Sequence, residues 1–227
     1  MPRTLNPEAH AVRRDAFVDV AQRLIQMKGY EQLSVHDVLD ELGASKGAFY
    51  HYFDSKEALL EAVVARMVVA ATATLAPIAT DPNLTALQKL EGVFAALASW
   101  KAERKELVLA LMRVWFSDDN AIVREKLRQG IAIHVAPLLA AIVRQGRAEG
   151  LFSASSPDDA ARVLVSLIQG ANEVASELFV ARQANAVAFG VVERTIGAYT
   201  EAFERILGLP ARSLTIVDGP TLRLWFD

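Results

Sequence analysis

The sequence lacks several features that would point to specific classes of protein. Its 227 residues contain no cysteine, which excludes disulfides, thiolate metal sites and cysteine nucleophiles and suits a reducing compartment. The formal net charge is −3, so the chain as a whole is not a polycation. No apolar core of a signal peptide is visible near the N-terminus, and the longest uncharged run, residues 67–80, is too short to span a bilayer. We therefore expect a soluble, cytoplasmic protein without a membrane partner.

Fingerprints of catalysis and metal binding are scarce as well. The four histidines, His10, His36, His51 and His134, form no cluster with metal-ligand spacing, and phosphate-loop and dinucleotide patterns are absent. Residues 43–47 do fit the G-x-S-x-G pattern of serine hydrolases, with Ser45 as the nucleophile. That chemistry needs a strand before the serine, whereas a helix is predicted there. A serine hydrolase stays an alternative reading, and no metal or cofactor is expected.

Apolar residues recur at helical spacing along most of the chain, which predicts an all-α fold. Two prolines are expected to interrupt this pattern: one helix should end before Pro77, and another should kink or split at Pro137. The tail, residues 213–227, carries β-type residues around Asp218-Gly219, a hairpin-like signal that Pro220 weakens. The predicted helices are residues 10–28, two short helices between 34 and 54, and residues 55–76, 85–101, 103–116, 119–149, 156–180 and 185–207.

The two short helices form the most informative stretch, residues 34–56, SVHDVLDELGASKGAFYHYFDSK. Ser34 can cap the first helix, with Asp37 at capping-box spacing, and Gly43 stands where a helix end often needs a left-handed residue. Ser45 can cap the second helix. Two helices joined by so short a turn predict a helix-turn-helix motif, whose second helix enters the major groove of DNA.

The second of these helices leaves polar residues outward that suit DNA. Candidate contacts to base edges and phosphates, on both helices and at the start of the next, are Ser34, His36, Ser45, Lys46, Gly47, Tyr50, His51 and Lys56. Bulk charge does not support the reading, since residues 1–56 hold seven basic and eight acidic residues. Contact must therefore come from arrangement, with basic residues on one face and acids on the other. A small helical hairpin with solvated polar residues is the competing interpretation.

Residues 13–60 resemble the N-terminal domain of the TetR (tetracycline-repressor-like) family of bacterial transcriptional regulators. The matching pieces are AQRLIQMKG at residues 21–29, the Leu33-Ser34-Val35 entry and, most specifically, SKGAFYHYFDSKEALL at residues 45–60. Where many members carry an Ile-Ala pair, this chain has Val38-Leu39, which remains apolar. The resemblance implies a DNA-binding domain at residues 1–54, a helical effector-binding and dimerisation domain at 55–212, and a tail at 213–227.

The resemblance also implies partners. It predicts a non-enzymatic repressor that binds a roughly palindromic operator as a homodimer and leaves it when a small molecule binds the second domain. Helices 156–180 and 185–207 would form the dimer interface; their burial within one subunit is the alternative. A DNA-binding dimer without any ligand is a further alternative.

An effector cavity, if present, should lie between the central helices, where aromatic walls with a few polar groups suit small molecules. Most such residues in a helical protein simply belong to the core. The candidate pocket residues are Phe94, Trp100, Met112, Trp115, Phe116, His134, Asn172, Glu173 and Phe179.

Overall fold

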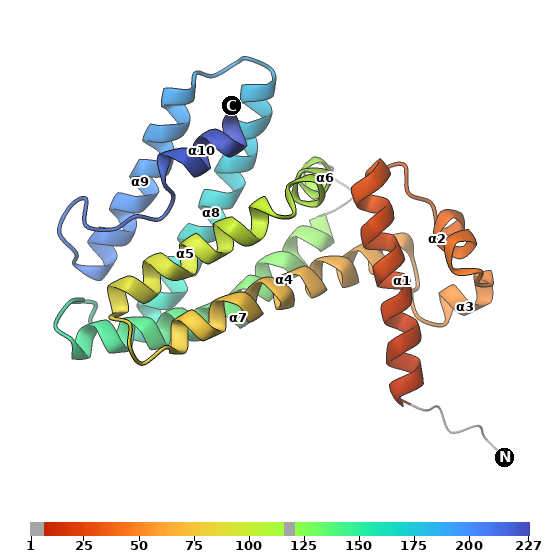
Figure 1. Cartoon of the computed structure of the whole chain (residues 1–227), viewed down its shortest axis with the longest axis horizontal. Helices are drawn as coiled ribbons and strands as arrows, with labels where there is room; N and C mark the ends of the chain where they lie inside the picture. The colour runs from red at the N-terminus through yellow and green to blue at the C-terminus, as the bar shows by residue number, and fades with distance from the viewer. Residues whose placement is uncertain (1–6, 116–120) are drawn as a thin grey trace. The chain divides into compact units, whose positions relative to one another are not determined.

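The chain is all-α, as predicted, and the computed structural model describes residues 7–115 and 121–227, among which there is no strand. Figure 1 shows the helices in chain order. They are α1 (Pro7–Lys28), α2 (Val35–Leu42), α3 (Lys46–Tyr50), α4 (Lys56–Thr80), α5 (Ala86–Ala102), α6 (Lys105–Trp115), α7 (Ala121–Ala148), α8 (Pro157–Gln183), α9 (Phe189–Leu207) and α10 (Gly219–Phe226).

The chain divides into two compact units. The first combines the described residues up to Val68 with Arg104–Leu127, and the second combines Val69–Glu103 with Arg128–Asp227. The long helix α4 therefore contributes residues to both units.

The first unit is a small bundle around the apolar face of α1, which packs against α2 and α6. Phe17 and Ile25 of α1 are fully buried, together with Phe49 of α3. Arg66 ties the first turns of α4 to α1, because its guanidinium pairs with Asp19 and donates to the amide oxygen of Gln22 at 2.6 Å. The core of this unit thus holds α2 and α3 against α1.

In the second unit, a polar network joins the start of α5 to the end of α7. The Lys89 ammonium is buried and donates to Gln145 Oε1 at 2.6 Å, and the Gln145 amide donates to Leu84 O. Glu149 accepts the free N–H of Ala86 in the first turn of α5 at 2.9 Å. That backbone hydrogen bond, followed by one from Gln145, lowers the pKa of Glu149.

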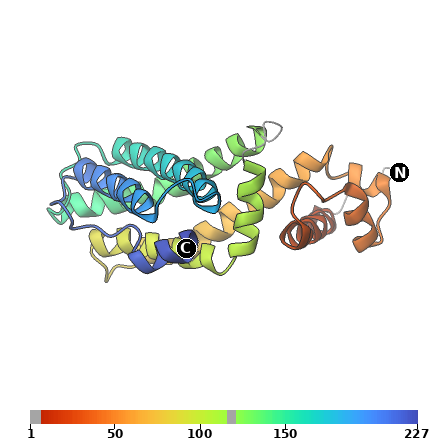
Figure 2. The same cartoon turned by 90° about the horizontal axis from the view of Figure 1, so that it is seen from above.

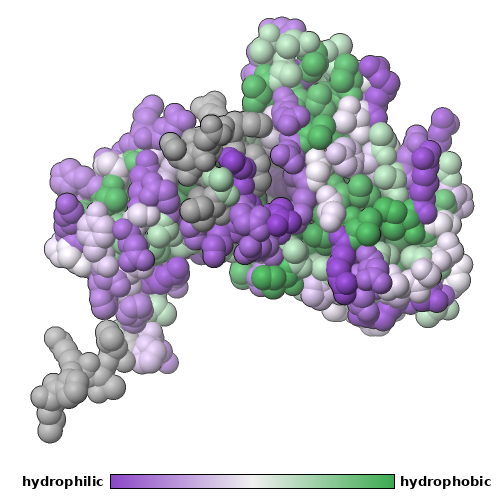
Figure 3. All heavy atoms as spheres, turned by 180° about the vertical axis from the view of Figure 1, so that it is seen from behind, coloured by the Kyte–Doolittle hydropathy of each residue, from purple (hydrophilic) through white to green (hydrophobic). Residues whose placement is uncertain are grey.

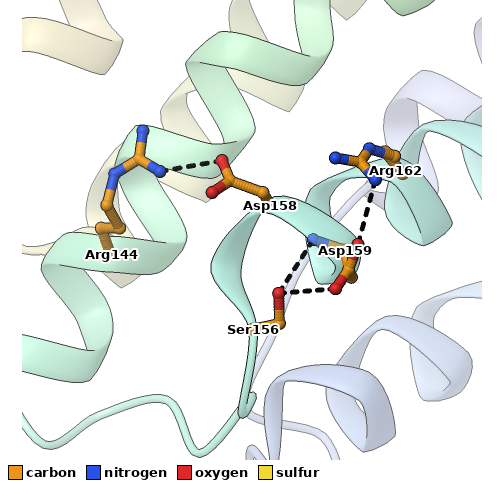
Figure 4. Close-up of polar contacts among 5 residues, drawn as sticks. All are labelled: Arg144, Ser156, Asp158, Asp159 and Arg162. Carbon is orange, nitrogen blue, oxygen red and sulfur yellow. Dashed lines mark hydrogen bonds and ion pairs between the residues drawn. The ribbon is translucent and has the colours of Figure 1, made fainter.

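The start signal predicted for α8 is confirmed in the close-up of Figure 4. Ser156 caps the helix by accepting from Asp159 N–H at 3.4 Å, and Pro157 occupies the first turn, where its missing N–H costs nothing. Asp158 pairs with Arg144 of α7 at 2.9 Å, while Asp159 pairs with Arg162 one turn further along α8 at 3.0 Å. The Arg144–Asp158 pair joins the beginning of α8 to α7, and the other contacts stabilise the first turns of α8 itself.

Helices α8 and α9 run side by side in opposite directions, as Figures 1 and 2 show. Their close contact is helped by Gly170, because a side chain there would approach the Tyr199 hydroxyl to 3.3 Å. Both helices keep much of their length outside the core; Val163 and Val180 of α8 are about half exposed, at 48% and 52%. Figure 3 shows hydrophobic surface on this unit, in green.

Two predictions, on Pro77 and on the tail, were wrong, and of the kink or split predicted at Pro137 the split does not occur. Helix α4 continues through Pro77 to Thr80, whose hydroxyl donates to Ala76 O at 2.9 Å in the last turn, and α7 runs through Pro137 as one helix. Residues 219–226 form a helix and no hairpin: Asp218 accepts from Thr221 N–H at 2.8 Å as its N-cap, and Pro220 lies in its first turn. The signal that weakened the hairpin is thus a helix-start signal.

The new helix α10 docks onto α8 and α9. Leu222 and Phe226 are buried there, and the rings of Phe226 and Phe179 lie 6.4 Å apart. The Arg182 guanidinium donates to Phe226 O at 3.1 Å and to Val187 O at 3.2 Å. One arginine thereby joins the end of α10 to the α8–α9 connection.

By length and composition alone, three helical stretches among the described residues are apolar enough to cross a membrane: α4, residues 124–148 of α7, and α8. The expectation that no segment qualifies is wrong by these two measures, because it counted only wholly uncharged runs. Each stretch contributes fully buried residues to helix packing, for example Leu75, Ile142 and Leu164. Part of their apolar surface is thus used in helix–helix contacts.

Candidate nucleic-acid interface

Helix α2 begins at a complete capping box. The Ser34 hydroxyl accepts from Asp37 N–H at 3.2 Å, and the Asp37 carboxylate accepts from Ser34 N–H at 2.7 Å. The helix ends at Gly43, whose φ of 58° is left-handed, and Ala44 N–H then donates to Leu39 O at 2.9 Å. Both predicted boundaries of α2 are confirmed, so local signals mark where this helix begins and ends.

Helix α3 has only five residues, too few to be stable alone. Ser45 caps it by accepting from Ala48 N–H at 3.2 Å. Phe49 is fully buried, and its ring lies 5.8 Å from that of Phe17 and 5.7 Å from that of Phe53. The aromatic cluster of Phe17, Phe49 and Phe53 therefore holds α3 on α1, with its opposite side turned to solvent.

Four residues predicted to contact DNA lie together on the solvent side of α3: Lys46, Gly47, Tyr50 and His51 are all exposed. The Lys46 ammonium is 5.9 Å from the centre of the Tyr50 ring, a cation–π distance. The His51 ring contacts the rings of His10 at 5.4 Å and Tyr52 at 4.9 Å. A side chain at Gly47 would meet only the Ser45 hydroxyl, at 3.9 Å, so packing within this chain does not require glycine there.

The acids of α2 are engaged by neighbouring side chains. Asp37 pairs with Lys28 at 2.7 Å, and hydrogen bonds from Lys28 and then from Ser34 lower the pKa of its carboxyl. Glu41 pairs with Arg23 at 2.7 Å. Helix α3 itself contains no acid. The arrangement thus separates an acid-free α3 from the acids of α2, which the bulk charge of the region does not reveal.

The remaining predicted contacts occupy different surroundings. Ser34 and His36 are exposed, and His36 Nδ1 lies 3.4 Å from an Asp40 carboxylate oxygen. Lys56 is partly buried, with its ammonium 4.1 Å from the centre of the Tyr30 ring, and this burial lowers the pKa of Lys56. Burial, followed by the nearby Glu57 carboxylate, raises the pKa of the Tyr30 hydroxyl. Lys56 is therefore more restrained by its own fold than Lys46.

Ser45 has a structural partner that bears on the hydrolase alternative. Its hydroxyl oxygen accepts the Ala48 N–H, and α2 precedes it where a nucleophile elbow needs a strand. Among the hydrogen bonds of the described residues, none joins Ser45 to a histidine. Within the same ranges there is no group of three or more His, Asp or Glu that could hold a metal ion.

Comparison with known proteins places this motif. The model of the bacterial regulatory proteins of the tetR family matches residues 17–63, which contain α2, α3 and the aromatic cluster. Residues 17–63 are therefore assigned to the TetR family. The resemblance seen in the sequence is thereby confirmed.

Relatives in the TetR family include the HTH-type transcriptional regulator EthR of Mycolicibacterium smegmatis, 27% identical over 144 residues, or 56% of this chain and 66% of EthR. The transcriptional repressor KstR2 of Rhodococcus jostii is 28% identical over 127 residues, or 50% of this chain and 60% of KstR2. The chain thus aligns with slightly less than two thirds of either relative.

A solved structure of RolR in complex with resorcinol has the same fold over nearly the whole chain. Its TM-score is 0.63 at 15% identity, and the match covers 96% of this chain and 95% of RolR. At this identity the likeness concerns the fold alone.

The candidate pocket residues lie in several different surroundings. Phe94 and Phe179 belong to separate apolar clusters, His134 and Glu173 are exposed, and Met112 lies in the first unit. Phe116 and the side chain of Trp115 lie outside the described residues. The two remaining candidates are Trp100, which is buried, and Asn172, which is partly buried.

Asn172 has a partner that sequence reasoning missed. The Lys101 ammonium donates to Asn172 Oδ1 at 3.1 Å, across α5 and α8. A lysine in the last turn of a helix ordinarily faces water and interacts favourably with the negative end of the helix dipole, so a partly buried Lys101 could not be expected from its position. An informative signal was available only on α8, where Asn172 interrupts an apolar stretch.

Proposed function

We propose that this chain is a homodimeric transcriptional regulator, most simply a repressor, that binds a roughly palindromic operator through α3. A small-molecule effector bound by the second unit would favour a dimer in which the two α3 helices no longer match successive major grooves. We further infer that it acts in the cytoplasm and is not an enzyme.

The observation that carries this proposal is the exposed side of α3, a helix that contains no acid and that the aromatic cluster holds on α1. Lys46 has no acidic partner among the described residues, and its neighbour Gly47 leaves the backbone open to close approach. Lysine and tyrosine suit phosphate oxygens and base edges. The names of EthR and KstR2 as transcriptional regulators support the same function.

Homodimerisation through α8 and α9 is supported by an exposed glycine. Gly197 lies in the interior of α9, where glycine costs a helix about 1 kcal/mol relative to alanine. A side chain at this position would meet nothing within 4 Å in the same chain. Close approach by the helices of a second copy would account for it. Gly197→Arg should therefore convert dimer to monomer in sedimentation equilibrium, whereas Gly219→Arg, also in open space but on α10, should remain dimeric.

The DNA function is tested by selecting operator sites from random or genomic fragments with the purified chain. We expect a palindromic site whose half-sites lie about 34 Å apart, one turn of the double helix, or a multiple of that. Lys46→Ala should bind this site about 10-fold or more weakly, since a phosphate or base contact contributes about 1–3 kcal/mol. Arg144→Ala, which removes an exposed charge on α7, away from α3 and from the proposed dimer helices, is the matched control.

Three outcomes would contradict all or part of the proposal. Equal operator affinity of the Lys46→Ala and Arg144→Ala variants would exclude α3 as the DNA-reading helix. Esterase activity lost in Ser45→Ala but kept in Lys46→Ala would favour the serine hydrolase. If no small molecule alters operator binding, the second candidate function, a DNA-binding dimer that has no ligand, is favoured.

A further inference from the structure

Lys101 is a cation without a counter-charge in the packed part of the second unit. Its side chain is partly buried, and its described hydrogen bond runs to a neutral amide oxygen, Asn172 Oδ1, at 3.1 Å. The ion pairs among residues 7–115 and 121–227 do not include it. An ammonium carries three N–H donors, of which Asn172 satisfies one.

The surroundings of this pair are apolar on two sides. Leu97, one turn before Lys101, and Ile168, one turn before Asn172, both pack against the main core of the second unit. Ala175, in the turn after Asn172, packs against the separate cluster beneath α10. The Lys101–Asn172 pair therefore lies where the two apolar clusters of the unit meet.

Such a cation is costly for the protein alone. Taking an ammonium out of water without an opposite charge is unfavourable, and lysine is seldom buried unless it is paired. Desolvation accordingly lowers the pKa of Lys101. A bound ligand with a negative charge would compensate the charge of Lys101.

We propose that Lys101 and Asn172 form the anion-recognition centre of the effector site, and that the effector is a small organic acid with one carboxylate on an apolar body. The inference deepens the proposed function and rests on it. The carboxylate accepts from the Lys101 ammonium, while the Asn172 amide N–H donates to its second oxygen. The apolar body packs against side chains of the two clusters, such as Leu97 and Ala175.

This geometry predicts a sharp preference between matched ligands. A methyl ester, a primary amide or an alcohol on the same body fills the same apolar space but leaves the ammonium without an opposite charge. Sites that hold a charged or hydrogen-bonding group discriminate strongly against analogues that lack it. We therefore expect the acid to bind about 10- to 100-fold more tightly than its neutral counterparts.

The experiment is a calorimetric titration of the full chain with benzoate, 3-phenylpropanoate, octanoate and decanoate, each beside its amide and methyl ester. Lys101→Met should weaken acid binding about 10-fold or more and leave neutral ligands unaffected. Asn172→Asp should do the same, because it supplies Lys101 with an internal carboxylate. Arg162→Met, which removes an equal charge from the exposed start of α8, should bind the acids as the unaltered chain does.

A second readout separates recognition from a structural role. If Lys101 serves a ligand, Lys101→Met without ligand should melt at the same temperature as the unaltered chain or higher, since an uncompensated cation is removed. If Lys101 only holds α5 to α8, the variant should melt lower and acid binding should not depend on it. Asn172→Asp tests recognition even if Lys101→Met folds poorly.

The proposal is overturned if no acid of the series binds, if acids bind no better than amides, or if both variants keep acid affinity. Operator affinity of each variant, measured without ligand, distinguishes failure of this inference from failure of the proposed function. If the variants bind operator normally and bind acids weakly, both the proposed function and the anion site are supported. A chain that binds acids through Lys101 but binds no operator contradicts the regulator and keeps the anion site.

Discussion

The two units of the chain stabilise their helices in different ways. In the first unit, the short α3 depends on a full capping box before α2, on Ser45, and on Phe49 in an aromatic cluster. In the second unit, long helices pack through aliphatic side chains, while Gly197 faces open space and the hydrogen-bond partner of Lys101 is a neutral amide, Asn172. The first unit thus stabilises its short helices by contacts within the chain, whereas we propose that Gly197 and Lys101 of the second unit serve a second copy and a ligand.

The largest effect should come from removing an aromatic side chain from either core. Phe49→Ala and Phe203→Ala each delete a fully buried ring and should cost about 3–5 kcal/mol. Hydrogen exchange followed by mass spectrometry locates the loss. Phe49→Ala should loosen α1–α3, and Phe203→Ala should loosen α5 and α9, where Phe203 meets Phe94 edge-on at 5.4 Å.

The same pair of variants tests whether the two units differ in their stability. If Phe49→Ala accelerates exchange equally throughout both units, they unfold as one cooperative body, and the distinction between them has no energetic meaning.

A smaller and equal effect is expected at the two capping boxes, one in each unit. Ser34→Ala and Thr85→Ala both remove a hydroxyl that accepts the N3 N–H, at 3.2 Å and 3.3 Å, and each should cost about 1 kcal/mol. Urea unfolding measures both. Ser34→Ala should also weaken operator binding, whereas Thr85→Ala should not. A loss of operator affinity in both would point to a general loss of stability instead.

Replacing either of two helical glycines by alanine should change stability by different amounts. Gly47→Ala should stabilise α3 by about 0.5–1 kcal/mol, because its new methyl group has room. Gly92→Ala should gain less or destabilise, since its Cβ would come within 2.9 Å of Ile78 Cγ2. Thermal unfolding measures these changes. Despite its added stability, Gly47→Ala should bind operator more weakly; undiminished affinity would show that DNA does not approach this backbone closely.

The smallest effect concerns acid pH and distinguishes the two capping boxes. Hydrogen bonds from Lys28 and Ser34 hold the folded pKa of Asp37 below its ordinary value of 3.8. Its stabilising contribution is therefore present above that value and is lost as pH falls from 3.8 toward the folded pKa. The Thr85 box uses neutral Gln88 and does not titrate.

The measurement for Asp37 is the difference in unfolding free energy between the chain and Asp37→Asn, taken from pH 6 downward. This difference should shrink below pH 3.8. A difference that stays constant with pH would mean that the carboxylate charge contributes nothing to the box.

The sequence was most informative where structure depends on neighbours along the chain. Ser34, Gly43 and Ser156 announce helix boundaries through their own hydrogen bonds and backbone angles, and all three lie as predicted. The prolines misled because helix breaking by proline is a local penalty that packing overrides. Pro77 and Pro137 lie inside helices whose neighbours are buried, such as Leu75 and Leu139.

The candidate sites divide in the same way. The exposed residues of α3 follow from helical spacing around Phe49, so their grouping could be predicted from the sequence. The partner of Asn172 could not, because Lys101 is 71 positions away and nothing along α5 marks it as inward-facing. Contacts between distant segments depend on the packing of whole helices, which single-sequence patterns do not encode.

The apolar stretch of α4 also has a consequence for synthesis on the ribosome. It is the most hydrophobic of the three apolar stretches, and its Leu75 and Ala79 belong to the same buried cluster as Leu139 and Val143 of α7. Because a chain emerges N-terminus first, this helix leaves the exit tunnel well before its cover exists. A nascent chain of this protein therefore exposes the apolar residues of α4 until α7 has been synthesised. The speed of translation between α4 and α7 sets how long chaperones must shield these residues.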